Sequence, residues 1–171
     1  MLLYQEKVSF KLFTPLMIIF IGITIFFFYI VYLHLMGVDV SETHGPIGAS
    51  IFMAIFFLFT TLIVAQFKEL AITINDEQLV VNFGFFKRVI KMNIIETPYI
   101  DKANALLSYG GWGIRLSRFK RKRRLVFNLP NTSRVVVPLK GKPQEFVFST
   151  ERPEEVLEAL KSLATAPKDA E

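Results

Sequence analysis

Two long uncharged apolar segments constrain the fold of this chain more than any other feature of its sequence. Residues 13–36 contain no Lys, Arg, Asp or Glu, and residues 47–67 form a second run of this kind. At 1.5 Å per residue the first run makes a helix of about 36 Å, and the hydrocarbon core of a bilayer is roughly 30 Å thick. We expect both runs to be transmembrane helices, because buried helices of soluble proteins are usually shorter and have a polar edge.

The distribution of basic residues predicts how these helices are oriented. The connection at residues 37–46 contains Asp39 and Glu42 but no Lys or Arg, whereas residues 1–12 contain two lysines and every other basic residue follows the second run. The positive-inside rule therefore predicts a multi-pass membrane protein with both termini in the cytoplasm and the connection outside. The first run exceeds the roughly 7–15 apolar residues of a signal peptide, so we expect it to be retained.

A mainly-β domain is predicted for residues 68–165, followed by a flexible tail at residues 166–171. From residue 68 onward apolar side chains alternate with polar ones, as in a strand with one buried face. Turn residues such as Asn75, Asp76 and Gly84 separate the alternating stretches. Seven short antiparallel strands are expected within residues 69–75, 78–84, 85–96, 112–117, 125–129, 134–139 and 145–149.

The domain is expected to end in one amphipathic helix that begins at Pro153. Proline suits the first helical position, and acidic residues in the first turn suit the helix dipole. Val156, Leu160 and Leu163 lie on one apolar stripe. Many short strands commonly close into a barrel to protect their edges, and a lone helix with one apolar stripe fits over the open end of such a barrel. The pattern predicts a membrane α-helical hairpin followed by a seven-stranded bent antiparallel barrel capped by a C-terminal helix.

Residues 69–163 resemble the bacterial pleckstrin homology (PH)-like domain family, whose members commonly follow two membrane spans. The resemblance depends on ELAITINDEQLVVNFG in the opening strands, GWGIRL at residues 111–116 and FVFSTERPEEVLEAL at residues 146–160. It implies a PH-like fold and a location in a bacterial inner membrane, and it brings no catalytic residue and no cofactor. Members of the family usually have a shorter and less basic turn after the strand that contains Arg115.

The candidate lipid- or partner-binding site is a basic tract, which consists of Arg118, Phe119, Lys120, Arg121, Lys122, Arg123 and Arg124. Because the domain follows the second span directly, we expect the tract to lie near anionic lipid headgroups, which attract each basic residue by about 1 kcal/mol. The alternative is a solvated hairpin loop that helps to set the topology. Nucleic-acid binding is not expected, because aromatic side chains are not interleaved with the charges.

Other candidate sites are less well supported. The chain has no cysteine, which excludes disulfides and thiolate chemistry. His34 and His44 have few further ligands nearby, so no metal site is expected. Trp112 and Arg115 could form a cation–π pair, but we expect Trp112 to pack into the barrel.

These features predict a non-enzymatic integral membrane protein whose cytoplasmic PH-like domain is an interaction module, as a scaffold or an accessory subunit. The expected partners are the lipid bilayer, anionic headgroups, and an unidentified membrane or cytoplasmic protein or a second copy of the chain. The alternative is a component of a membrane transport or enzyme complex with an unrecognised site. The apolar runs lack the ionisable residues that usually mark a transport pathway, which favours the first interpretation.

Overall fold

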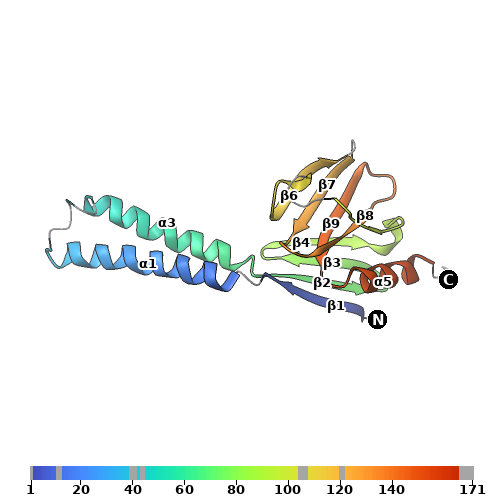
Figure 1. Ribbon diagram of the computed structural model, residues 1–171, viewed down its shortest axis with the longest axis horizontal. Coiled ribbons are helices and arrows are strands. Elements are labelled where there is room, and N and C mark those ends of the chain that lie inside the picture. Colours follow the sequence, from blue (N-terminus) through green and yellow to red (C-terminus); the bar gives the residue numbers. More distant parts are fainter. Residues whose placement is uncertain are drawn as a thin grey trace. The chain divides into compact units, whose positions relative to one another are not determined.

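The computed structural model describes residues 2–10, 13–38, 42, 45–103, 108–119 and 122–165. The chain divides into two compact units (Figure 1). We call Lys11–Lys68 the helical unit, and Met1–Phe10 together with Glu69–Glu171 the β unit. The predicted flexible tail at residues 166–171 lies outside the described residues.

The helical unit contains two long helices, α1 (Phe13–Leu35) and α3 (Ile47–Ala65), which pack against each other as a hairpin. Both are long and apolar enough to cross a membrane, as the sequence predicts. The hydroxyl oxygens of Thr24 and Thr61 lie 3.0 Å apart in the interface between them. Ser50 and Ala54, one helical turn apart, are buried and allow the two backbones to approach closely.

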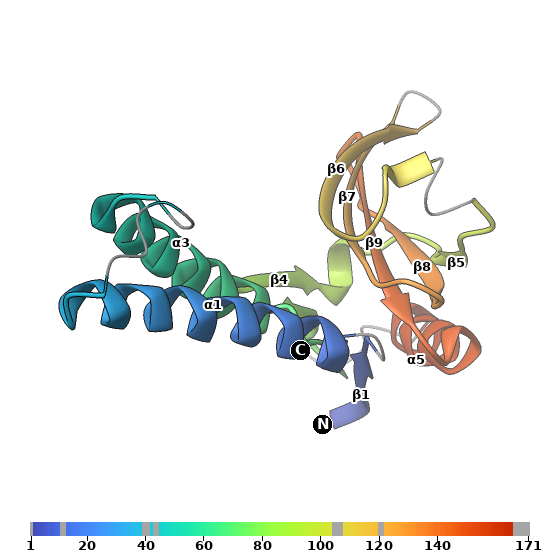
Figure 2. The same ribbon diagram turned by 60° about the vertical axis from the view of Figure 1, so that its left-hand side comes forward.

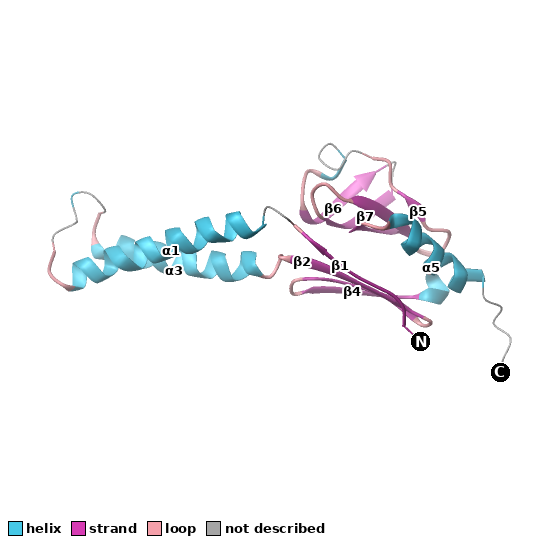
Figure 3. Cartoon of the chain, turned by 60° about the horizontal axis from the view of Figure 1, so that its bottom comes forward, coloured by secondary structure: helices cyan, strands magenta, loops and turns pink. Residues whose placement is uncertain are grey.

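The β unit consists of two sheets and a C-terminal helix, which Figure 3 shows as two layers with the helix beside them. The order of the four-stranded sheet is β1-β2-β3-β4, and that of the five-stranded sheet is β5-β8-β9-β7-β6. The bounds of these elements are β1 Leu2–Ser9, β2 Glu69–Asn75, β3 Gln78–Phe83, β4 Phe86–Lys91, β5 Tyr99–Ile100, β6 Gly113–Phe119, β7 Lys122–Asn128, β8 Ser133–Pro138, β9 Gln144–Thr150 and α5 Pro153–Thr165, with the 3₁₀ helix η1 at Met92–Ile94.

The main core lies between the inner faces of the two sheets. In β2 and β3 every second side chain is buried, which is the alternation that the sequence predicts for a half-buried strand. Phe83 of β3 meets Phe127 of β7 across the core, with ring centroids 6.3 Å apart. Phe127 in turn contacts Phe146 edge-to-face at 5.2 Å. Aromatic contacts therefore join the two layers.

The structure corrects the predicted barrel. No closed barrel forms among the described residues, because β4 and β6 end their sheets without pairing with each other. The sheets are also not wholly antiparallel, since β7 pairs with β9 in parallel. Two additional strands, β1 and β5, raise the described number from the predicted seven to nine. The edge of β2 is paired with β1 rather than with a strand that would close a barrel.

β1 is a strand that the sequence analysis did not predict, and a buried carboxylate holds it in place. Tyr4, Glu6 and Val8 point into the β unit, opposite the buried residues of β2. The Glu6 carboxylate accepts hydrogen bonds from the Thr150 hydroxyl at 2.5 Å and from the Glu151 backbone N–H at 2.9 Å. Burial, followed by the hydrogen bond to Glu6, raises the pKa of Tyr4 to about 12. β1 is therefore tied both to β2 and to the end of β9.

The C-terminal helix α5 is present as predicted. Val156 and Leu160 are fully buried on its apolar stripe. The helix contacts β1, β5, β8 and η1, so it covers the side of the two layers on which β1 and β5 are the edge strands. Figure 2 shows α5 beside β8.

Candidate functional site

The described part of the basic tract lies at the end of β6 and the start of β7, which pair as a hairpin (Figure 2). Lys120 and Arg121 lie outside the described residues, and so does the side chain of Phe119. Arg118 of β6 pairs directly with Arg123 of β7, and both side chains are exposed. Like charges at directly opposite positions destabilise a strand pair. The exposed pair is therefore costly to the fold.

Arg124 is not part of the exposed basic surface. Strand alternation turns it to the face opposite Arg123, and it is only 4% exposed. Its Nε lies 2.8 Å from Oε2 of Glu145, and its two terminal nitrogens donate to the hydroxyls of Tyr109 at 2.6 Å and Tyr99 at 2.9 Å. Its inclusion among the surface residues is corrected, because its charge is used inside the β unit.

Lys122 also points toward this buried acid. Its Nζ lies 2.7 Å from Oε1 of Glu145, although the lysine side chain itself is largely exposed. The parallel pairing of β7 with β9 places Arg124 beside Glu145, so the two basic residues share one carboxylate. Whether the remainder of the basic tract binds lipid or a partner stays a prediction.

Asp101 is a second buried acid and completes what we call the polar network: Tyr99, Asp101, Tyr109, Arg124, Arg134 and Glu145. Asp101 accepts a hydrogen bond from the Tyr109 hydroxyl at 2.6 Å and lies 3.3 Å from Nε of Arg134. Arg134 also donates to the carbonyl oxygen of Ala103. Tyr109 packs with Val126, Val136 and Val147 in a small core on the outer face of the five-stranded sheet. The network therefore fastens residues near positions 100 and 109 onto that face.

The charges of the network compensate one another. Burial alone would raise the pKa of Glu145, but the hydrogen bonds and positive charges of Lys122 and Arg124 outweigh it and lower that pKa. Burial and the hydrogen bond to Asp101 raise the pKa of Tyr109. Glu145 is therefore ionised and Tyr109 is neutral near pH 7. Such a network positions segments of chain, and the sequence analysis missed it.

Trp112 does not pack into a barrel, which corrects the expectation for this residue. It is 52% exposed, and its ring centroid lies 5.7 Å from that of Phe10. Nε of Arg115 donates to the backbone carbonyl of Trp112 at 3.2 Å, rather than lying over the indole. Gly113, with a φ of 87°, turns the chain from Trp112 into β6. Trp112 is therefore a surface residue.

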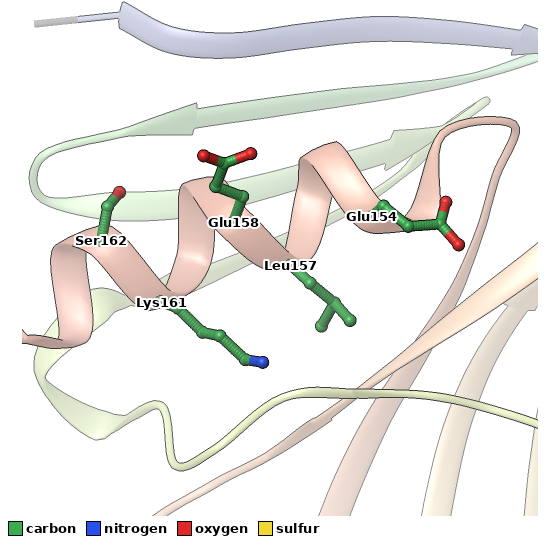
Figure 4. Close-up of a pocket in the computed structure, with 5 residues that line it drawn as sticks. All are labelled: Glu154, Leu157, Glu158, Lys161 and Ser162. Atoms are coloured by element: carbon green, nitrogen blue, oxygen red, sulfur yellow. The ribbon is translucent and has the colours of Figure 1, made fainter.

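An open depression lies along α5 and is lined by Glu154, Leu157, Glu158, Lys161 and Ser162 (Figure 4). All five side chains come from one helix, and Figure 4 shows Leu157 and Lys161 on the same side of it. Within the described residues no three His, Cys, Asp or Glu side chains come together as metal ligands would.

Comparison of the chain with protein-family models, with curated proteins and with solved structures gives no match. The resemblance to PH-like domains over residues 69–163 therefore stays a prediction.

We predict that Arg124→Met destabilises the β unit far more than Arg123→Met. Removing Arg124 takes away the cation that Glu145 and Asp101 share inside the protein, which costs up to about 3 kcal/mol. Lys122 stays beside Glu145 and Arg134 beside Asp101, so neither acid loses every cation. Arg123 is exposed, and its loss should change stability by no more than about 0.5 kcal/mol. Hydrogen-exchange mass spectrometry of the full chain in detergent measures this as the opening free energy of β7 and β9 amides. Equal effects of the two substitutions would contradict the buried role of Arg124.

We predict that acid weakens the β unit through Glu145. Its pKa is lower in the folded chain than the ordinary value of 4.5. Its contribution to stability is complete above that ordinary value and is lost as the pH falls through the lowered one. The urea midpoint, followed by circular dichroism, should stay constant above about pH 4.5 and fall as the pH is lowered further. Glu145→Gln should lower the midpoint at pH 6 and reduce its further fall in acid; an unchanged acid response would show that other groups control it.

Proposed function

We propose that this chain is an integral membrane protein whose β unit is a PH-like interaction module at the cytoplasmic face. In this role it is a scaffold or accessory subunit that binds another protein. The proposal assigns no catalysis and no cofactor to the chain.

Membrane insertion is supported by the apolar side chains that α1 and α3 expose. Ile18, Phe52 and Phe59 are among the large apolar residues that neither helix buries. In water each exposed Ile or Phe would forfeit about 1.5–3 kcal/mol relative to burial, whereas lipid tails cover such surfaces. The excess of basic residues outside the 37–46 connection supports cytoplasmic termini.

The observation that carries the interaction role is the free edge of β6. This strand ends its sheet and has no ladder partner on its outer side in the part of the chain that the structure describes. At its centre Leu116 is 81% exposed, and Arg115 and Arg118 on the same strand are exposed as well. A long exposed edge with an apolar side chain is a template for a further strand.

The chemistry of this edge favours one kind of partner, an extended protein segment with acidic residues. Such a segment would add a strand through backbone hydrogen bonds and cover Leu116. Its carboxylates would neutralise the opposed pair Arg118 and Arg123, whose repulsion costs the free protein stability. Binding of an acidic segment would therefore remove a repulsion between Arg118 and Arg123 that remains in the free folded protein.

The orientation can be tested with two matched cysteine variants, because the chain contains no cysteine of its own. Glu42 lies between the two apolar helices, and Glu77 lies in the exposed β2–β3 turn of the β unit. Glu42→Cys should react with a membrane-impermeant maleimide in intact spheroplasts, and Glu77→Cys only after the membrane is permeabilised. The reverse pattern, or equal labelling, would refute cytoplasmic termini.

The binding edge can be tested by photocrosslinking in cells. A photoreactive phenylalanine at Leu116 should give a defined protein adduct, whereas the same residue at the exposed turn position Glu77 should not. Arg118→Glu together with Arg123→Glu should reduce the adduct at least about tenfold, because two attractive charges become repulsive. An adduct that forms equally at both positions, survives the charge reversal or contains only lipid would refute protein binding at this edge.

A further inference from the structure

Strand register brings three parts of the β unit to one end of the four-stranded sheet. Ser9, the last residue of β1, pairs with Glu69, the first residue of β2. Next to them Leu70 pairs with Phe83, and Phe83 pairs with Phe86 across the β3–β4 turn. The turn therefore lies at the end of the sheet where the chain leaves for α1 and returns from α3.

This end carries one half-buried and three exposed aromatic side chains, and we call Phe10, Phe85, Phe86 and Trp112 the aromatic end. Phe85 in the turn is 71% exposed, and Phe86 is 51% exposed. Trp112 belongs to the same end because its ring packs against Phe10, the residue that follows β1. Both phenylalanines lie at the tip of the β3–β4 hairpin, and each has at least half of its surface exposed.

Basic residues are close in sequence to these rings, although strand alternation turns Lys87 to the face of β4 opposite Phe86. Lys87 directly follows Phe86 and is exposed, and Arg115 is exposed with its Nε held at the carbonyl of Trp112. Aromatic rings beside lysine or arginine are typical of protein surfaces at the headgroup level of a bilayer. There the rings reach the acyl boundary while the cations stay among the phosphates.

We propose that the aromatic end docks into the headgroup region of the bilayer that holds α1 and α3. The inference rests on the proposed membrane insertion. The bilayer is the partner of this surface because of chain continuity. Only residues 10–12 and 66–68 connect the strands of this end to the two apolar helices. Any bilayer that contains the helices is therefore within a short length of chain of these rings.

Docking would fix one end of the β unit, and if β6 stands away from the bilayer the exposed end of the β6–β7 hairpin stays free. β6 begins beside Trp112 and ends at Phe119, about 20 Å further along the strand. The free edge of β6 and the exposed pair Arg118 and Arg123 would then remain available to a partner protein.

Trp112 is the only tryptophan in the chain, so its fluorescence reports on this surface alone. The full chain would be reconstituted into vesicles of phosphatidylcholine and phosphatidylglycerol. Docking predicts blue-shifted emission, stronger quenching by lipids brominated near the headgroup than by lipids brominated near the chain end, and protection from aqueous iodide. Water-like emission with full access to iodide would overturn the proposal.

A matched pair of variants separates docking from general effects. Phe85→Ser with Phe86→Ser removes the apolar tip and should raise the iodide quenching constant of Trp112 by at least about threefold. Leu2→Ser with Leu3→Ser also removes two exposed apolar residues, but at the opposite end of the same sheet, and should leave that constant unchanged. Equal effects of the two pairs, or no effect of the first, would overturn docking through the phenylalanines.

A second reporter covers the case in which the double serine variant fails to fold. Phe85→Trp in a Trp112→Phe background moves the sole tryptophan to the tip, where docking again predicts emission shielded from iodide. Vesicle flotation after an alkaline wash tests insertion separately. A chain that floats but has a water-exposed tryptophan refutes docking alone, and a chain that does not float refutes both docking and the membrane proposal.

Discussion

The pairing of β1 with β2 is the constraint on which the arrangement of this chain depends. It places Ser9 beside Glu69, so the chain leaves the β unit for α1 and returns from α3 on neighbouring strands. An antiparallel helix hairpin also has its first and last residues at one end, so a strand pair can continue into a helix pair without a long loop. Glu6 secures the pairing from the other side, since its carboxylate is held by Thr150 and the Glu151 backbone. A carboxylate inside the core is tolerated because each of its oxygens receives a hydrogen bond.

The polar network explains why β7, β8 and β9 of the five-stranded sheet are buried on both faces. One face contributes Phe127, Phe146 and Phe148 to the main core, and the other carries Val126, Val136 and Val147 beneath Tyr109. Strands buried on both faces appear in the sequence as continuous apolar runs instead of alternating ones. Charged residues in such a sheet must find partners inside it, because an unpaired buried charge costs several kcal/mol. The network therefore determines where the residues near positions 100 and 109 lie on the sheet. Its hydrogen bonds and ion pairs position these residues more than they raise the net stability.

Part of this structure could be predicted from the sequence, and the reasons differ for the parts that could not. The helical hairpin and α5 follow from patterns of apolar residues that lie within a single helix, so the sequence of each helix is enough to predict it. β1 was missed because a charged residue, Glu6, occupies one of its inward positions and its partner strand lies some 60 residues further on. A run of consecutive charges has no period, so it did not reveal that Arg124 and Lys122 face one way and Arg123 the other. Glu145 was the available signal: an acid at the start of the apolar stretch EFVFS indicates a buried cation nearby.

If the aromatic end docks as proposed, the orientation of β6 on the bilayer decides between lipid and protein as the ligand of the exposed end of the β6–β7 hairpin. Attraction between exposed charges fades over a Debye length of about 8 Å at physiological ionic strength. The strand holds its basic end about 20 Å from its aromatic end, so headgroups around a docked Trp112 would attract Arg118 and Arg123 strongly only if β6 lay flat on the bilayer. A strand that lies flat would also press its edge and Leu116 toward lipid and hide them from a partner. A strand that stands away from the surface presents both the edge and the paired arginines to an acidic segment of another protein, and the two interactions then act at opposite ends of β6 without competing.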